Sequence, residues 1–160
     1  SMRGNFIYTL LVLLIASSCN QEKIISVNLN PIKADINGDI EELQKQLEKR
    51  KTMLVYENSY EGEAKGIKMF YFDDENDSLH YHIEIYTIDH KIKGIEAGLS
   101  SKQLTKERLY DKVEKEILPD FESSTRQLDN ATTKAERNGL DSTGYYSFEI
   151  KTQDLKEKMQ

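Results

Sequence analysis

The chain has 160 residues, 38% of them hydrophobic and 31% charged, and its formal net charge at pH 7 is −6. This length suits one domain with one core and argues against two domains. The acidic balance argues against a nucleic-acid partner and against broad adhesion to anionic lipid, and it favours a basic protein partner or simply solubility.

The first segment of the chain has the layout of an export signal. Arg3 precedes an apolar stretch, residues 6–15, which three small residues separate from Cys19. An apolar stretch of about ten residues is too short to span a bilayer as a permanent helix. We therefore expect residues 1–18 to be removed on export, and we interpret Ser1 as a cloning remnant.

The residues Ala16-Ser17-Ser18-Cys19 resemble the lipobox of bacterial lipoproteins, in which the signal is cut before a cysteine that carries lipid. The resemblance covers this N-terminal segment alone, and it implies that Cys19 receives a diacylglycerol and an acyl chain such as palmitate. Each buried methylene contributes about 0.8 kcal/mol, so several chains would hold the protein on a membrane of the cell envelope, facing the periplasm or the cell surface. A plain secretory signal and an uncleaved anchor are the two alternatives.

The mature chain begins with a polar stretch. Loss of residues 1–18 leaves a net charge of −7, and acylation of Cys19 leaves no thiol for a disulfide. Pro31 and its polar neighbours are typical of a flexible tether, while the alternating apolar residues at 25–29 leave an added strand open. We divide the mature chain into a lipidated cysteine with its tether, one α+β domain and a charged tail, at 19–34, 35–152 and 153–160.

Residues 40–51 are predicted to form a helix. Asp39 and Glu42 have the spacing of a capping box. Apolar residues then recur at helical spacing with Glu and Lys between them: Ile40, Leu43, Leu47 and Leu54.

Five later segments are rich in β-branched, aliphatic and aromatic residues and predict strands: 52–56, 67–72, 79–86, 91–95 and 145–151. The acidic residues 73–78 and the pair Asp89-His90 suit turns, and such short connections predict an antiparallel meander.

Two metal sites can be formulated in this region. Four carboxylates fall at positions 1, 3, 5 and 12 of a calcium loop: Asp73, Glu75, Asp77 and Glu84. However, Ser78 replaces the glycine of such a loop, and a strand follows where a helix is required. Two imidazoles on one strand face, with a third nearby, have the spacing of zinc ligands: His80, His82 and His90. Such histidines are more often solvated, so we expect neither a metal nor another cofactor.

From residue 101 the apolar period is helical again, with one stripe: Leu109, Val113 and Ile117. Pro119 is predicted to end or kink this helix, with a continuation over 120–128 left open. Residues 129–144 are rich in turn-forming residues and predict a long loop or a frayed helix.

These elements predict an α+β fold: an antiparallel sheet of four to five strands with two helices packed on one face. We place three apolar residues at the centre of its core: Phe70, Ile83 and Phe148.

The sequence contains none of the common catalytic motifs, so we do not expect an enzyme. We expect a membrane-anchored interaction module, such as a component of a membrane or secretion assembly. Tyrosines beside acidic residues suit an amphipathic contact surface, and the candidates are Tyr60, Glu61, Glu84, Tyr86, Tyr110, Asp111, Asp141 and Tyr145. The alternatives are an immunity-type lipoprotein that neutralises a toxin and a lipoprotein that binds a small ligand or a metal.

Overall fold

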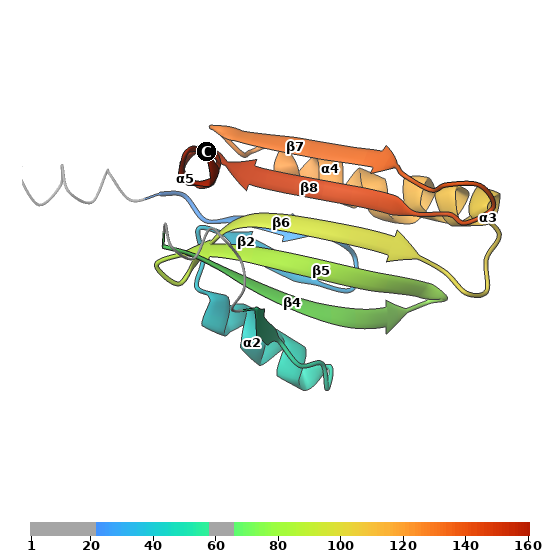
Figure 1. Ribbon diagram of the computed structural model, residues 1–160, viewed down its shortest axis with the longest axis horizontal. Coiled ribbons are helices and arrows are strands. Elements are labelled where there is room, and N and C mark those ends of the chain that lie inside the picture. Colours follow the sequence, from blue (N-terminus) through green and yellow to red (C-terminus); the bar gives the residue numbers. More distant parts are fainter. Residues whose placement is uncertain (1–21, 58–65) are drawn as a thin grey trace, which may run out of the picture.

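The fold is built on one antiparallel sheet of six strands (Figure 1), in a computed structural model that describes residues 22–57 and 66–160. In spatial order the strands are β3 (Val55–Glu57), β4 (Ile67–Asn76), β5 (Leu79–Ile88), β6 (Lys91–Ser100), β8 (Tyr146–Thr152) and β7 (Ala131–Arg137). The predicted class, α+β, is therefore confirmed. The sheet is larger than the four to five strands expected.

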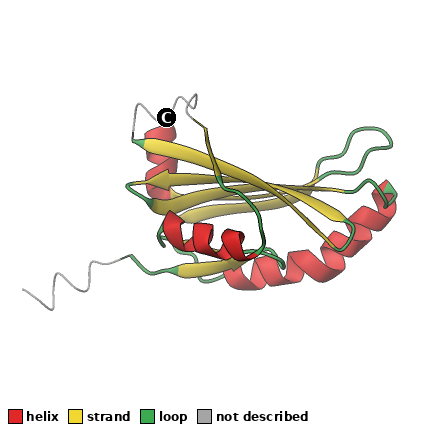
Figure 2. Ribbon diagram, turned by 90° about the horizontal axis from the view of Figure 1, so that it is seen from below, coloured by secondary structure: helices red, strands yellow, loops and turns green. Residues whose placement is uncertain are grey.

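The helices lie on both sides of this sheet (Figure 2). One side is covered by a hairpin of β1 (Ile25–Asn28) and β2 (Lys33–Ile36), by α2 (Ile40–Lys49), and by a long helix. The long helix consists of α3 (Lys106–Lys112), a π-helical turn, η2 (Val113–Ile117), and α4 (Leu118–Thr125). The short helix α5 (Gln153–Met159) lies on the opposite side, because its Leu155 contacts Gly94 and joins a small cluster with Ile67 and Tyr86.

The main core fills the space between the sheet and the covering elements. Ile83 and Phe148 are fully buried there, and Phe148 packs edge-to-face on Phe121 of α4 with ring centroids 4.8 Å apart. Phe70 is only partly buried, because the strand beyond it, β3, has just three residues. Two of the three predicted core centres thus lie at the centre, and the third lies near the sheet edge.

The segment expected to be a tether is mostly folded. Val27, Leu29 and Ile36 are buried in the main core, and the hairpin that carries them packs against α4, where the Asn28 N–H donates to Ser124 Oγ at 3.0 Å. The alternating apolar residues therefore decide that this segment folds as a hairpin, although it also contains many polar residues. The charged and possibly helical tail expected at 153–160 contains the helix α5, and its Leu155 is buried.

Pro119 does not end the long helix. The π-helical turn lies immediately before it, and Pro119 occupies the first turn of α4, where its missing N–H leaves no gap in the hydrogen bonding. A π turn widens the helix locally, so the proline ring fits without breaking the run.

Three further local predictions are corrected. Asp39 precedes α2, but its carboxylate makes no cap and instead pairs with Lys91 Nζ at 3.0 Å. Within the segment predicted as a loop, residues 131–137 form the edge strand β7, whose exposed polar residues hide the strand pattern. The first acidic turn is also shorter than expected: β4 runs on to Asn76, and Asp77-Ser78 alone turn the chain, both with positive φ.

Candidate functional site

The candidate site lies on the side of the sheet that the long helix and α2 do not cover, here called the open face. Side chains alternate along the strands, so every second residue points to this face. Its polar members come from five neighbouring strands: Asp73, Glu75, His80, His82, Glu84, Glu96, Ser147, Glu149, Lys151, Lys134 and Glu136. The helix α5 covers only the end of the open face near Gly94.

Three glutamates stand in one row across the open face. Glu84 of β5 is paired directly with Glu96 of β6, and Glu96 is paired directly with Glu149 of β8. We call these three residues the glutamate row. Directly opposed side chains lie about 5 Å apart at Cβ, and like charges in such positions destabilise a sheet. Their side chains are 30%, 37% and 35% exposed, so water screens the repulsion only in part.

Among the described residues, one tyrosine hydroxyl and one lysine ammonium group make the close contacts to the glutamate row. The Tyr86 hydroxyl lies 3.0 Å from Glu84 Oε2 and 3.2 Å from Glu96 Oε2, and it has a single proton to donate. Lys151 Nζ lies 2.7 Å from Glu149 and 3.4 Å from Glu96. Burial alone would lower the pKa of Lys151, but its bond to Glu149 and the charges of both glutamates raise it. One lysine thus serves two carboxylates.

Glu84 is the carboxylate with the weakest charge partner. Among residues 22–57 and 66–160, its ion pairing is limited to His82 Nε2 at 3.5 Å. Lys134, which is paired with Glu149 in register, turns its ammonium group to Glu136 at 3.0 Å. The glutamate row is therefore incompletely neutralised.

A cleft of about 320 Å³ lies beside the glutamate row. Its lining includes all three glutamates, Gly98 and Tyr145. A side chain at Gly98 would overlap the Tyr145 phenol, so the absence of a side chain there lets the ring lie against the sheet. Burial, with the charges of Glu84 and Glu96, raises the pKa of Tyr145. The cleft thus combines carboxylates with a half-exposed aromatic ring.

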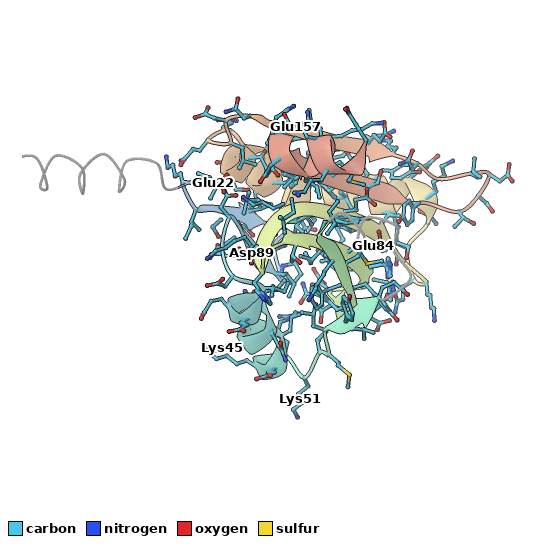
Figure 3. The ribbon with its side chains drawn as sticks, turned by 60° about the vertical axis from the view of Figure 1, so that its left-hand side comes forward. Glu22, Lys45, Lys51, Glu84, Asp89 and Glu157 are labelled. Carbon is cyan, nitrogen blue, oxygen red and sulfur yellow. The ribbon has the colours of Figure 1, made fainter. Side chains whose placement is uncertain are left out.

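The structure brings together three of the sequence-predicted contact residues: Glu84, Tyr86 and Tyr145. Glu84 is labelled in Figure 3, on the side away from α2. Tyr86 is 5% exposed, so only its hydroxyl end serves the glutamate row.

The other predicted contact residues lie elsewhere. Tyr110 is buried under the long helix, where its hydroxyl accepts from the Gly139 N–H at 3.1 Å, so it serves the core. Asp111 is exposed on α3 and pairs with Lys115 at 2.8 Å, and the backbone carbonyl of Asp141 accepts from Lys106 at 2.9 Å. Three positions lie outside the described residues: Cys19, Tyr60 and Glu61.

The histidines do not form a three-ligand group. His80 Nε2 and His82 Nδ1 both contact Asp73 Oδ1, at 2.9 Å and 3.1 Å. His90 lies in the turn beyond the other end of β5, and the six residue steps from His82 to Ile88 alone span roughly 20 Å at about 3.3 Å per residue. In the described parts of the chain, no three or more His, Cys, Asp or Glu side chains are arranged to hold a metal ion.

A second polar cluster joins the two ends of the described chain. The Lys93 side chain is 6% exposed, and its ammonium group contacts Glu22, donates to Asn37 Oδ1 at 2.8 Å and lies 3.1 Å from Asp154 of α5. Burial opposes the charged form of Lys93, but these partners outweigh it and raise its pKa. Glu22 and Glu157 of α5 lie at the same end of the molecule (Figure 3), where both line one shallow pocket. This cluster ties Glu22 to β6 and α5.

Comparison with protein-family models, with curated proteins and with solved structures found no match to this chain. None of the helices among the described residues has both the length and the apolar character that crossing a membrane requires.

Sequence reasoning missed Glu96, Gly98 and Glu149 as site residues. Each lies in a predicted strand or just beyond one, but their alignment across the sheet depends on strand order, which the sequence did not determine. The one usable signal was Gly98 itself, because a glycine inside a strand often marks the close approach of another group.

Proposed function

We propose that this protein is a membrane-anchored envelope lipoprotein that acts as a non-catalytic interaction module and binds a protein partner on its open face. The observation that carries the proposal is the glutamate row. A fold needs only polar residues on an uncovered sheet face, and alternating charges would stabilise it better than three glutamates in register. A basic partner would relieve this repulsion, which gives the arrangement a use in binding.

The proposed anchor would place the folded domain close to the bilayer. Glu22 is bound to Lys93, and only two residues separate it from Cys19. At about 3.5 Å per extended residue, three steps reach roughly 10 Å. A lipid on Cys19 would therefore hold the Glu22 end of the domain near the membrane surface, and the strands would carry the glutamate row away from that end.

The anchor is tested by membrane fractionation of the full chain and of Cys19→Ala. Lipidation predicts that the wild type partitions with membranes and that the variant is released or keeps its signal. A Cys19→Ala protein that is correctly processed and still wholly membrane-bound would refute the lipid anchor.

The binding face is tested by site-specific photo-crosslinking. A photo-reactive residue replaces Glu136 on the open face, and the matched control replaces Glu107, which is exposed on α3 on the other side of the sheet. We expect a protein adduct from position 136 that weakens as salt rises, since the Debye length contracts from about 10 Å at 0.1 M to about 3 Å at 1 M. Equal adducts at both positions, or none at 136, would refute the open face as the interface.

The second candidate is an immunity-type lipoprotein, which the same glutamate row favours because an acidic face can cover a basic active site. The two candidates differ in their partner. A toxin gene beside this gene, with inhibition of that toxin by the purified protein, would support the second candidate. A cluster of secretion-machinery genes would support the first.

A further inference from the structure

We infer that the cleft beside the glutamate row receives an arginine side chain of the protein partner. The inference rests on the proposed function and specifies the chemistry of its contact. Charge complementarity on the open face, the shape of the cleft and the aromatic ring that borders it all favour such an occupant.

Glu84 and Glu96 are the two neighbouring carboxylates that an incoming cation would meet. Their carboxylates share the single proton of the Tyr86 hydroxyl, and the nearest lysine, Lys151, lies closer to Glu149 than to Glu96. A guanidinium group has five N–H donors in a planar fork and can donate to two carboxylates at once. Among the described residues, the cationic contacts of this pair are long, His82 at 3.5 Å from Glu84 and Lys151 at 3.4 Å from Glu96, so an arginine placed between the two carboxylates would add closer donors.

Gly98 and Tyr145 give the cleft its shape. The ring of Tyr145 lies against the sheet at Gly98 and is 38% exposed, so part of it faces solvent beside the carboxylates. A guanidinium stacks on an aromatic ring while it pairs with carboxylates, whereas an ammonium group is a compact, strongly hydrated charge. The cleft, about 320 Å³ in volume, has room for such a side chain. These features favour arginine over lysine.

The spacing of the glutamate row determines the design of a peptide probe. Neighbouring strands lie about 4.8 Å apart, so the three glutamates span roughly 10 Å. Alternate side chains of an extended peptide lie about 7 Å apart, which places two arginines within that span. The probe is a fluorescein-labelled peptide, Gly-Ser-Arg-Ser-Arg-Ser-Gly. Its matched control carries citrulline, which has the shape of arginine without its charge, at both positions.

Fluorescence anisotropy with the full chain in detergent micelles tests the inference. We expect the arginine peptide to bind at least tenfold more tightly than the citrulline peptide, and Glu84→Gln with Glu96→Gln to weaken it at least tenfold. Glu107→Gln, on the other side of the sheet, is the matched control and should change nothing. Tyr145→Phe should keep the affinity and Tyr145→Ala should lower it several-fold, since stacking needs the ring.

A loss of peptide binding in the glutamine variants can be distinguished from a folding defect. Glu84→Gln still accepts the hydrogen bond from Tyr86 and removes the repulsion with Glu96, so its thermal midpoint should not fall below that of the wild type. Equal binding of the two peptides, or equal effects of the paired substitution and Glu107→Gln, would overturn the inference. So would displacement of the peptide by an equal concentration of free L-arginine, which would indicate a small-molecule site.

Failure of the arginine contact can be distinguished from failure of the proposed function. If position 136 still forms a salt-sensitive protein adduct while the arginine and citrulline peptides bind equally, the open face is an interface and the arginine contact is wrong. If the adduct is also absent, both proposals are refuted.

Discussion

Truncation of Phe148 to alanine should cost about 3 to 5 kcal/mol of unfolding free energy, as large-to-small changes of buried phenylalanines do. Phe148 is 2% exposed and packs on Phe121 at 4.8 Å and on Tyr146 at 5.2 Å, so little of the cavity can collapse. His80, by contrast, lies on the open face with a side chain 36% exposed. His80→Ala removes a surface pair with Asp73 and should cost less than about 1 kcal/mol.

Urea unfolding followed by circular dichroism measures this difference. With a slope of about 2 kcal/mol per molar urea, Phe148→Ala should lower the midpoint by roughly 2 M and His80→Ala by less than about 0.5 M. Glu84→Ala, also on the open face, serves as a second control. Comparable losses at Phe148 and His80 would refute the reasoning, because a register shift by one residue exchanges the two faces of a strand.

Three further predictions concern other parts of the molecule. The pKa of Lys93 is raised above 10.5 and that of Asp154 is lowered below 3.8, so their contribution is present between these pH values. It should be lost as the pH rises through the pKa of Lys93 or falls through that of Asp154, and Lys93→Met should flatten both limbs of a stability profile measured by urea unfolding. Tyr81→Phe should raise the free energy of unfolding by about 1 kcal/mol, because the buried Tyr81 hydroxyl has no hydrogen-bond partner within the described chain; a lower thermal midpoint would contradict this. Gly98→Ala should displace the Tyr145 ring, so that the phenol pKa falls toward 10.0 in an ultraviolet titration; an unchanged titration would contradict the packing.

The parts of the fold that could be predicted are those where local pattern and burial agree. Residues 79–86 alternate strictly, and the structure buries Tyr81 and Ile83 while it leaves His80 and His82 on the open face. The turn at Asp89-His90 also follows from residue type, since both adopt positive φ. A half-buried strand and a tight turn are specified by a few neighbouring residues, and these are available in the sequence.

The parts that were missed depend on distant packing. The hairpin around Pro31 looks polar in isolation, yet Val27 and Leu29 are buried because the main core and α4 receive them. The edge strand β7 lacks an apolar face of its own and is held by pairing with β8. Propensity cannot report such partners, because tertiary packing decides whether these segments are ordered.

The candidate site is hidden from the sequence for the same reason. The sequence identifies Glu84 and Tyr145 as single residues. A contact surface can be predicted only when it is known which strands are neighbours in the sheet. The last strand, β8, pairs with β6 and thereby places Glu149 directly beside Glu96. No local pattern predicts that pairing, because it joins segments separated by the long helix.

The glutamate row also bears on why, among the described elements, α5 covers only one end of the open face. The helix α5 has seven residues and covers one end, where Leu155 packs on Gly94. A longer apolar helix over the glutamate row would have to bury three carboxylates that share one lysine, and each unpaired buried charge costs several kcal/mol. On the proposed function, a partner that brings its own cations would pair with the same row that disfavours such a helix. Among the described residues, the acidity of the open face and the short reach of α5 over it therefore follow from one feature, and both would suit the proposed binding of a basic protein.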